Sequence, residues 1–426
     1  MRDEKAFARS ILSIVGSNHV TSPPDIVIDG LRPSLLVRPG SMEEVRACLK
    51  VSAEHGASVV PAGQMTWLEA GNPMRRVELI LSLDRMRRVV DYSPPDLTAT
   101  VESGLKLTEF NEMTLAERQW LPLDPPGLSS SLGAIASCNS SGPLRLGFGV
   151  PRDYVIGIDL VHADGTSSKS GGKVAKNVAG YDMNKLYVGS HGTLAIMTQI
   201  TFKLRPMPDC SSTLLITSSN PASLFQTGRL VLNSELQPAS IILTQRLPES
   251  VALCASDDAL LLRFIDNEAA VQAQVKRVVS ASEKDHQLRV NVLSQMESEA
   301  LWRAVADLEH RETRIKVSVP ISATRDLLDH STTLLPDCIA AADLGTGIIR
   351  LAFDADDESA VDSINRVRAS AAAVNGSAVI EKAALQVRRE IDSWGDVGST
   401  ATLMRSIKAA FDPQSLLNPG KFVLGL

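Results

Sequence analysis

GGKVAKNVAGYDMNKLYVGSHGTLAIMTQITFKLR, residues 171–205, is the stretch that decides the fold. Glycine recurs through its first part, and from Leu194 to Leu204 large apolar residues return at almost every second position. This two-residue period predicts a strand with one buried face, stopped by Pro206 and Pro208. Because glycine allows close approach to the backbone, the loop before the strand suits a large planar cofactor lying against main chain. A turn-rich connection packed on a sheet is the alternative interpretation.

Length and composition limit the classes of protein to consider. The 426 residues are enough for two or three domains. The net charge of −6 is not the excess of basic residues that is typical of nucleic-acid-binding proteins. No apolar run reaches the roughly 20 residues of a membrane helix. The N-terminal segment lacks a small-residue cleavage site, so a cytoplasmic location is expected. The five cysteines form no CxxC pair, so we expect no zinc or iron–sulfur site in this chain.

Residues 35–66 predict a parallel crossover unit that ends in a loop. Residues 35–37 form a short apolar strand, Ser41 and Glu44 form a capping box for a helix, and residues 57–60 resume as a strand. The loop 61–66 then follows the carboxyl end of a parallel strand, where several backbone N–H groups can point at one anion. An ordinary structural turn is an equal alternative from these residues alone.

A second unusual stretch is SSSLGAIASCNSS, residues 129–141, which follows two prolines. Its small side chains let the backbone approach a ligand, and its hydroxyls can bond phosphate or ring oxygens. Leu132 and Ile135 interrupt the polar residues, which argues against an exposed serine linker.

The second half of the chain alternates short strands and helices. Residues 214–216, 241–243 and 259–264 read as strands, and 268–281 and 359–373 read as helices. This order predicts an antiparallel sheet with helices on one side. A last amphipathic helix near residues 404–411 precedes a tail that is expected to return to the first half.

These motifs resemble the FAD-binding domain of the vanillyl-alcohol oxidase, or PCMH-type, flavoproteins. The matching pieces are Pro-x-Gly-x-x-Thr at 61–66, Ser-Leu-Gly at 131–133 and Gly-Ser-x-Gly-Thr-Leu at 189–194. Within this superfamily the chain is most similar to the E-subunit family of glycolate oxidases. That similarity rests on Gly-Pro-Leu-Arg at 142–145, on residues 172–182 and on Leu-Asn-Pro-Gly-Lys at 417–421. The similarity to this family is close over residues 27–208 and clear over residues 399–422, and it is only loose over the residues between these two ranges.

The resemblance implies an α+β fold with FAD as the cofactor. It implies a two-subdomain PCMH-type FAD-binding domain over 1–208 and an α+β cap domain, an antiparallel sheet with helices, over 209–390. A C-terminal segment over 391–426 would return to the FAD domain. The residues expected to bind FAD are Pro61, Ala62, Gly63, Gln64, Met65, Thr66, Asp124, Pro125, Ser131, Leu132, Gly133, Ala134, Ala136, Ser141, Gly142, Gly149, Gly189, Gly192, Thr193, Ile196 and Lys421.

Two positions depart from the family pattern inside this expected site. Gln64 and Met65 stand where family members often have glycines, so the loop binds a pyrophosphate only if both residues accept the required backbone angles. His191 replaces the usual glutamate of Gly-Ser-x-Gly-Thr, and we interpret it as a solvated or packed loop residue.

A catalytic motif of the family is missing from the cap. Relatives that oxidise 2-hydroxy acids carry His-x-Gly-Asp-Gly-Asn-x-His, whose histidines bind metal and abstract a proton. The nearest stretch here is 341–347, where Asp343, at an ordinary pKa of about 4, is a weak base at neutral pH. No two of the seven histidines have the i, i+2 or i, i+4 spacing of a metal site. No catalytic residue is assigned, and no metal site is expected.

We therefore expect the FAD-binding subunit of a glycolate oxidase (glycolate dehydrogenase) complex, which oxidises glycolate, a small 2-hydroxy acid, to glyoxylate. A homologous FAD-containing D-type subunit would supply the histidine-bearing site, and an iron–sulfur F-type subunit would drain electrons. The isolated chain would be inactive. The location would be cytoplasmic, or peripheral at the inner membrane through these partners. The alternatives are a self-sufficient FAD-dependent 2-hydroxy-acid dehydrogenase and a cofactor-free assembly subunit.

Overall fold

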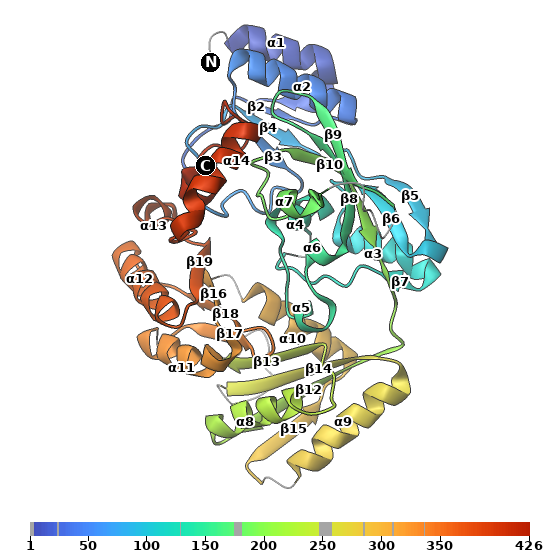
Figure 1. Ribbon diagram of the computed structural model, residues 1–426, viewed down its shortest axis with the longest axis vertical. Coiled ribbons are helices and arrows are strands. Elements are labelled where there is room, and N and C mark those ends of the chain that lie inside the picture. Colours follow the sequence, from blue (N-terminus) through green and yellow to red (C-terminus); the bar gives the residue numbers. More distant parts are fainter. Residues whose placement is uncertain are drawn as a thin grey trace. The chain divides into compact units, whose positions relative to one another are not determined.

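The structure, a computed structural model, describes residues 4–23, 25–127, 129–173, 181–246, 258–283, 286–308, 311–335 and 337–426. It divides into two compact units, each assembled from separate stretches of the chain (Figure 1). The first unit comprises Met1–Ser140, Val150–Met207 and Asp396–Leu426, and the second comprises Ser141–Gly149 and Pro208–Gly395. Residues 174–180, part of the quoted match to the E-subunit family, lie outside the described residues.

The first unit begins with a four-stranded sheet of order β1-β2-β4-β3, in which β2, β4 and β3 run parallel. Its elements are α1 (Glu4–Val15), β1 (Val20–Thr21), β2 (Leu35–Val37), α2 (Met42–His55), β3 (Val59–Ala62) and β4 (Leu79–Ser82). Helix α2 starts where the sequence predicts, because Ser41 Oγ accepts a hydrogen bond from Glu44 N. It ends at Gly56, whose φ of 63° is left-handed. The two strands of the predicted crossover flank β4 rather than pair directly.

The second sheet of this unit is antiparallel, with the order β5-β6-β10-β8-β9. Its strands are β5 (Val89–Ser93), β6 (Thr98–Glu102), β8 (Val155–Val161), β9 (Ser167–Gly171) and β10 (Ile196–Lys203). The prediction of one buried face for β10 was wrong, since Met197 and Thr201 on the opposite face are also buried. Strand β10 is central in this sheet, and helix α4 (Leu132–Cys138) packs against it.

Short elements complete the first unit. They are α3 (Leu107–Thr114), β7 (Gln119–Trp120), α6 (Pro151–Tyr154), α7 (Asn184–Tyr187), β11 (Arg205–Pro206) and α14 (Ala401–Phe411). Short 3₁₀ turns lie at Ser17–His19, Pro94–Asp96, Leu115–Glu117, Gly398–Thr400 and Val423–Gly425. The tail after α14 joins the first sheet, because Val59 N donates to Leu416 O and Asn418 N donates to Val59 O. The first unit is thus closed by residues from both ends of the chain.

The second unit is built on one eight-stranded antiparallel sheet of order β15-β12-β14-β13-β17-β18-β16-β19. The strands are β12 (Cys210–Ser218), β13 (Ser240–Gln245), β14 (Asp258–Asp266), β15 (Leu288–Val292), β16 (Thr313–Ser318), β17 (Ile339–Asp343), β18 (Ile348–Phe353) and β19 (Ser377–Lys382). The helices are α5 (Arg145–Phe148), α8 (Pro221–Leu232), α9 (Glu268–Ser282), α10 (Gln295–Asp307), α11 (Thr324–Leu334), α12 (Asp357–Ala373) and α13 (Leu385–Glu390), with a 3₁₀ turn at Ile321–Ala323.

The prediction of helices on only one side of this sheet was wrong. Leu214 and Leu262 point to a core that includes residues of α8, α9, α11 and α12. Leu215 and Leu261, one position along each strand, are equally buried but belong to a separate cluster with Trp302 of α10. Alternate side chains of a strand point to opposite faces, so α10 covers the second face. The sequence signal was present in the unbroken apolar runs of β12 and β14.

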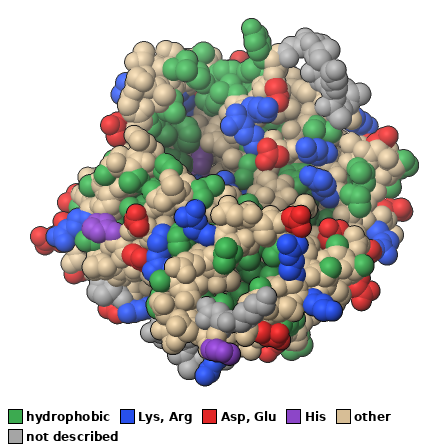
Figure 2. Space-filling model, turned by 60° about the horizontal axis from the view of Figure 1, so that its bottom comes forward, with side chains coloured by type: hydrophobic (Ala, Val, Ile, Leu, Met, Phe, Trp, Pro, Cys, Tyr) green, Lys and Arg blue, Asp and Glu red, His purple; other side chains and the backbone are tan. Residues whose placement is uncertain are grey.

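The surface gives no sign of a membrane span or of charge separation on the face that is drawn. Among the described residues, no helix combines the length and apolar character needed to cross a bilayer. Figure 2 shows acidic and basic side chains intermixed on one face rather than gathered by sign.

Candidate functional site

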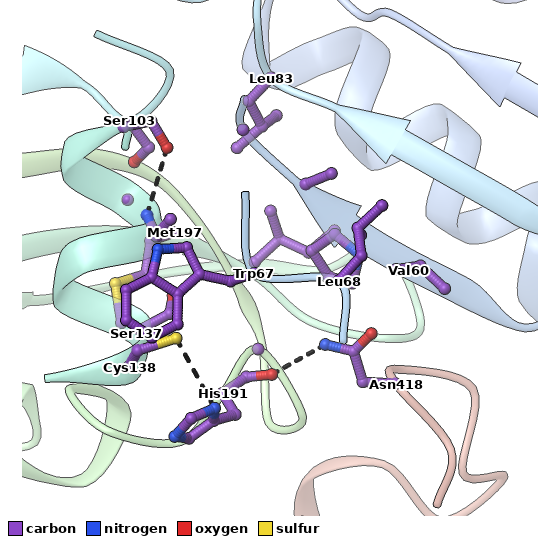
Figure 3. Close-up of a pocket in the computed structure, with 18 of the residues that line it drawn as sticks. Val60, Trp67, Leu68, Leu83, Ser103, Ser137, Cys138, His191, Met197 and Asn418 are labelled. Carbon is purple, nitrogen blue, oxygen red and sulfur yellow. Dashed lines mark hydrogen bonds between the residues drawn. The ribbon is translucent and has the colours of Figure 1, made fainter. Parts of the chain in front are cut away.

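A cavity in the first unit encloses about 790 Å³ of empty space, open solvent at its mouth included. Its walls come from the end of β3 and the loop after it, from α4, from the loop before β10 and from the C-terminal tail (Figure 3). These are the segments that the sequence singled out as glycine-rich, serine-rich or matching the C-terminal motif. The fold therefore brings together distant segments: the lining residues Leu68 and Lys421, for example, are 353 positions apart in the chain.

Several residues predicted to bind a cofactor line this cavity. They are Pro61, Ala62, Gly63, Met65, Thr66, Ser131, Gly133, Ala134, Gly192, Ile196 and Lys421. Residues of both glycine- and serine-rich segments, 131–136 and 189–196, thus face one common space.

Other predicted residues support the walls or lie elsewhere. Leu132 and Ala136 point into the core beneath α4. Gly189 N donates to Ala136 O, and Thr193 Oγ1 donates to Ser190 O, so both hold the loop in place. The remaining predicted residues are outside the lining: Gln64, Asp124 and Pro125 in the first unit, and Ser141, Gly142 and Gly149 in the second.

Glycine is required at position 63 by close packing. A Cβ there would overlap the Ser131 hydroxyl, because the loop after β3 crosses the start of α4 at van der Waals distance. Met65, two positions on, adopts a left-handed φ of 58°. The loop therefore reaches the conformation that glycine usually supplies, although a methionine occupies the position.

Helix α4 presents its small side chains to the cavity. Residues 129–141 were predicted as a stretch of small residues near a ligand, and the structure adds that most of them form a helix. Ser131 Oγ caps its N-terminus by accepting from Ala134 N at 3.3 Å. Gly133 N donates to Ser103 O at 2.8 Å, and a Cβ on Gly133 would lie 2.7 Å from Ser103 Cβ. Only a residue without a side chain permits this contact.

His191 is a lining residue rather than a solvated loop residue. Its backbone is left-handed, with φ 53°, its N donates to Ser137 O, and its O accepts from Asn418 Nδ2 at 2.8 Å. Its Nδ1 lies 3.6 Å from Cys138 Sγ (Figure 3). The centroid of its ring lies 5.5 Å from that of the Phe422 ring. The interpretation as a packed residue is correct, but its place in the cavity wall was missed.

The C-terminal tail is held against the cavity by a buried ion pair. Lys408 Nζ donates to Asp412 Oδ2 at 2.7 Å, to Leu417 O at 3.0 Å and to Thr193 O at 2.8 Å. Burial lowers the pKa of Lys408, while the Asp412 carboxylate acts in the opposite direction. Lys421 Nζ, further along the tail, donates to Leu68 O and lies 3.9 Å from Asp29 Oδ2. The tail thus supplies the cavity with a buried cation.

Sequence reasoning did not name several lining residues as cofactor-binding. They are Val60, Trp67, Leu68, Leu83, Ser103, Ser137, Cys138, Ala195, Met197 and Asn418. Asn418 lies inside the quoted Leu-Asn-Pro-Gly-Lys motif, and Trp67 follows directly on the loop 61–66, so both had a signal. Leu83 and Ser103 follow strands β4 and β6, and only the tertiary fold brings them to the cavity.

Asp343 of the second unit is not the ordinary carboxylate assumed from the sequence. It is 4% exposed at the end of β17, and its Oδ1 accepts from Gly345 N and Thr346 N at 3.0 and 3.1 Å. Burial raises the pKa of this carboxyl, and the hydrogen bonds from Thr346 and Gly345, together with the charge of Arg145, oppose the shift only in part. Asp343 lines a smaller cavity of about 270 Å³ with Arg145 and Arg350.

Among the described residues, no three His, Cys, Asp or Glu side chains are grouped to hold a metal ion.

Comparison with known proteins agrees with this geometry. A model of the FAD binding domain matches residues 33–171, and a model of the C-terminal domain of FAD linked oxidases matches residues 250–422. The solved structure of p-cresol methylhydroxylase with substrate bound aligns with a TM-score of 0.78 at 14% identity. That alignment covers 98% of this chain and 96% of the other, and it shows the α+β fold of the PCMH type.

Three relatives are informative. Glycolate oxidase subunit GlcD of Bacillus subtilis is 28% identical over 91% of this chain and 88% of its own length. D-2-hydroxyglutarate dehydrogenase of Xanthomonas citri is 27% identical over 91% of this chain and 89% of its own. Glycolate oxidase subunit GlcE of Escherichia coli is 34% identical, but only over 44% of this chain and 50% of its own.

The two matched domains establish FAD as the cofactor and oxidoreduction as the class of reaction. This chain belongs to the FAD-linked oxidoreductases with a PCMH-type FAD-binding domain.

Proposed function

We propose that this chain binds FAD in the cavity of the first unit and serves in the oxidation of a small 2-hydroxy acid, as the flavin subunit of a glycolate oxidase-type complex. The observation that carries the proposal is the convergence of the loop 61–66, helix α4 and the loop 189–196 on one cavity. The substrate class rests on the relatives, which include glycolate oxidase subunits and a 2-hydroxyglutarate dehydrogenase.

The residues of the cavity suit FAD. Small side chains on α4 and glycines 63 and 192 leave main chain open to a large planar molecule. Lys421 is a buried cation suited to anionic groups, and Ser103 Oγ and Asn418 Oδ1 are buried polar atoms without a hydrogen-bond partner in the described structure. Such atoms are stabilised when a ligand pairs with them. When bound, FAD would accept the two electrons that a 2-hydroxy acid loses.

The second unit fits the role of a cap, and the boundaries that we propose remain 1–208, 209–390 and 391–426. Within these, the FAD domain would position the cofactor, and the cap would shape the space for substrate. The sequence holds no histidine pair at metal-site spacing, so a histidine-bearing D-type subunit would supply the base, and an iron–sulfur F-type subunit would accept electrons. The complex would reside in the cytoplasm, with any membrane attachment through partners.

A self-sufficient FAD-dependent 2-hydroxy-acid dehydrogenase is the second candidate. Two observations favour it: the relatives GlcD and D-2-hydroxyglutarate dehydrogenase match almost the whole chain, and burial raises the pKa of Asp343. A carboxyl with a raised pKa is better suited to proton transfer at neutral pH than a solvated one.

One experiment tests the proposal and separates the two candidates. The chain is purified alone, and flavin absorbance is recorded before glycolate, D-lactate and D-2-hydroxyglutarate are each assayed with an artificial electron acceptor. We expect bound FAD and no turnover until a homologous histidine-bearing subunit is added. Turnover by the chain alone would establish the second candidate, and the absence of bound flavin would contradict both.

A further inference from the structure

Trp67 combines an anchored ring edge with partial exposure. It lines the cavity directly after the loop 61–66, and it is neither buried nor fully exposed. Its indole Nε1 donates a 2.9 Å hydrogen bond to Ser130 Oγ, which also lies 3.0 Å from Thr66 Oγ1. Ser130 is itself fully buried. The hydroxyl of Ser130 therefore fixes one edge of the indole.

Small side chains make up part of the wall on the side toward which Trp67 projects, where Met197 also lies. Figure 3 shows the indole projecting from its loop toward the side of the cavity where Ser137 and Cys138 lie. Ala134 and Gly192 also line the cavity, and none of these four residues carries a large side chain. A flat indole face, together with small residues on that side of the cavity, suits contact with a planar ring.

We propose that Trp67 stacks on a ring system of FAD. The inference rests on the proposed placement of FAD in this cavity. An indole held at its polar edge keeps its face free for contact, and such a ring loses little conformational freedom on binding. FAD offers two planar ring systems, the isoalloxazine and the adenine, and the shared chemistry is an aromatic face. The pairing would make Trp67 a binding residue for the cofactor.

The test compares three variants with the unmodified chain. Trp67→Leu removes the aromatic face, Trp67→Phe keeps a face but not the N–H donor, and Ser130→Ala releases the edge of the indole. Trp394→Leu is the matched control, because Trp394 is also half-buried but belongs to the second unit. FAD is removed from each protein, and the Kd for added FAD is measured by flavin fluorescence, with thermal unfolding as the check of folding.

We expect Trp67→Leu to raise the Kd for FAD about tenfold or more, which is the size of one aromatic–base stacking contact. Trp67→Phe and Ser130→Ala should give smaller increases, and Trp394→Leu should give none. If Trp67→Leu and the unmodified chain bind FAD with the same Kd, the proposal that Trp67 stacks on FAD is wrong.

Two smaller probes identify the ring. Riboflavin carries the isoalloxazine without adenine, and ADP carries adenine without the isoalloxazine. Stacking on the isoalloxazine predicts that Trp67→Leu weakens riboflavin binding and leaves ADP unchanged, and stacking on adenine predicts the reverse. If neither probe responds to Trp67→Leu, the proposal is wrong even where FAD still binds. If the unmodified chain binds no FAD, the proposed function itself fails.

Discussion

Lys408, on the last long helix, donates a hydrogen bond from Nζ to the carbonyl oxygen of Thr193, at 2.8 Å. The two residues are 215 positions apart in the chain, and both are buried. The contact ties helix α14 to the loop that forms one wall of the cavity, so changes in the tail are expected to reach the cofactor.

Lys408→Met should destabilise the first unit by about 3–5 kcal/mol, because the change leaves the Asp412 carboxylate buried without its cation. Urea unfolding measures this difference. Adding Asp412→Asn to Lys408→Met should recover part of the loss. Lys169→Met is the control, since that lysine pairs with Asp159 at the surface and should contribute no more than about 1 kcal/mol. Equal effects of the two lysine changes would contradict a structural role for the buried pair.

Gly63→Val should release FAD from a chain that still folds, because a side chain there meets Ser131 and displaces the loop after β3. The smaller change Gly63→Ala allows a sharper test. Combined with Ser131→Gly, which removes the hydroxyl that the new Cβ would strike, it should regain part of its FAD affinity. Glycine is tolerated as a helix N-cap at a cost of a few tenths of a kcal/mol, so the second change should not itself unfold α4. Unchanged flavin content in Gly63→Val would show that the loop is only structural.

The pH dependence of stability should reveal the buried Asp343. Because its pKa is raised in the folded chain, the native state holds a proton that the unfolded state has already lost. Stability is therefore lost as the pH rises from the ordinary aspartate value of 3.8 through the folded pKa. Asp343→Asn keeps the acceptor for Gly345 N and Thr346 N, and it should flatten this slope in urea unfolding between pH 4 and 7.

Asp354→Asn provides a control of opposite sign. A hydrogen bond from Arg311 lowers the pKa of Asp354, so its contribution to stability is present above the ordinary value and is lost as the pH falls. Both variants changing the pH dependence in the same direction would refute the account of Asp343.

His191→Asn and His330→Asn should change kcat of a reconstituted complex only a few-fold, because the proposed base belongs to the partner subunit. Asparagine accepts the left-handed backbone of position 191, so the first change should preserve the loop. Steady-state kinetics with FAD occupancy measured in parallel is the test. A fall of about a thousandfold on either change, with FAD still bound, would place the base in this chain.

The sequence predicted those parts of the fold and site that local chemistry determines. The N-cap at Ser41 and the end of α2 at Gly56 follow from short-range patterns, and both are present. The Glu44 carboxylate accepts from Gly40 N rather than from Ser41 N, so the second hydrogen bond of the predicted capping box is shifted by one residue. The close packing of Gly63 against the Ser131 side chain depends on the tertiary fold. The burial of both faces of β10 and the position of α10 depend on packing between distant segments. The spacing of apolar residues within one strand could not predict either feature. Leu83 and Ser103 reach the cavity through the same long-range packing.

The tail that pairs with Val59 also has a consequence for the order of events during synthesis. Asn418 and Lys421 line the cavity, and the ribosome synthesises them only after Pro208–Gly395, the larger part of the second unit. A nascent chain in which the loop 61–66 and helix α4 have already been synthesised still lacks the part of the cavity wall that the C-terminal tail supplies. The proposed binding of FAD in this cavity therefore depends on a wall that is synthesised after Pro208–Gly395.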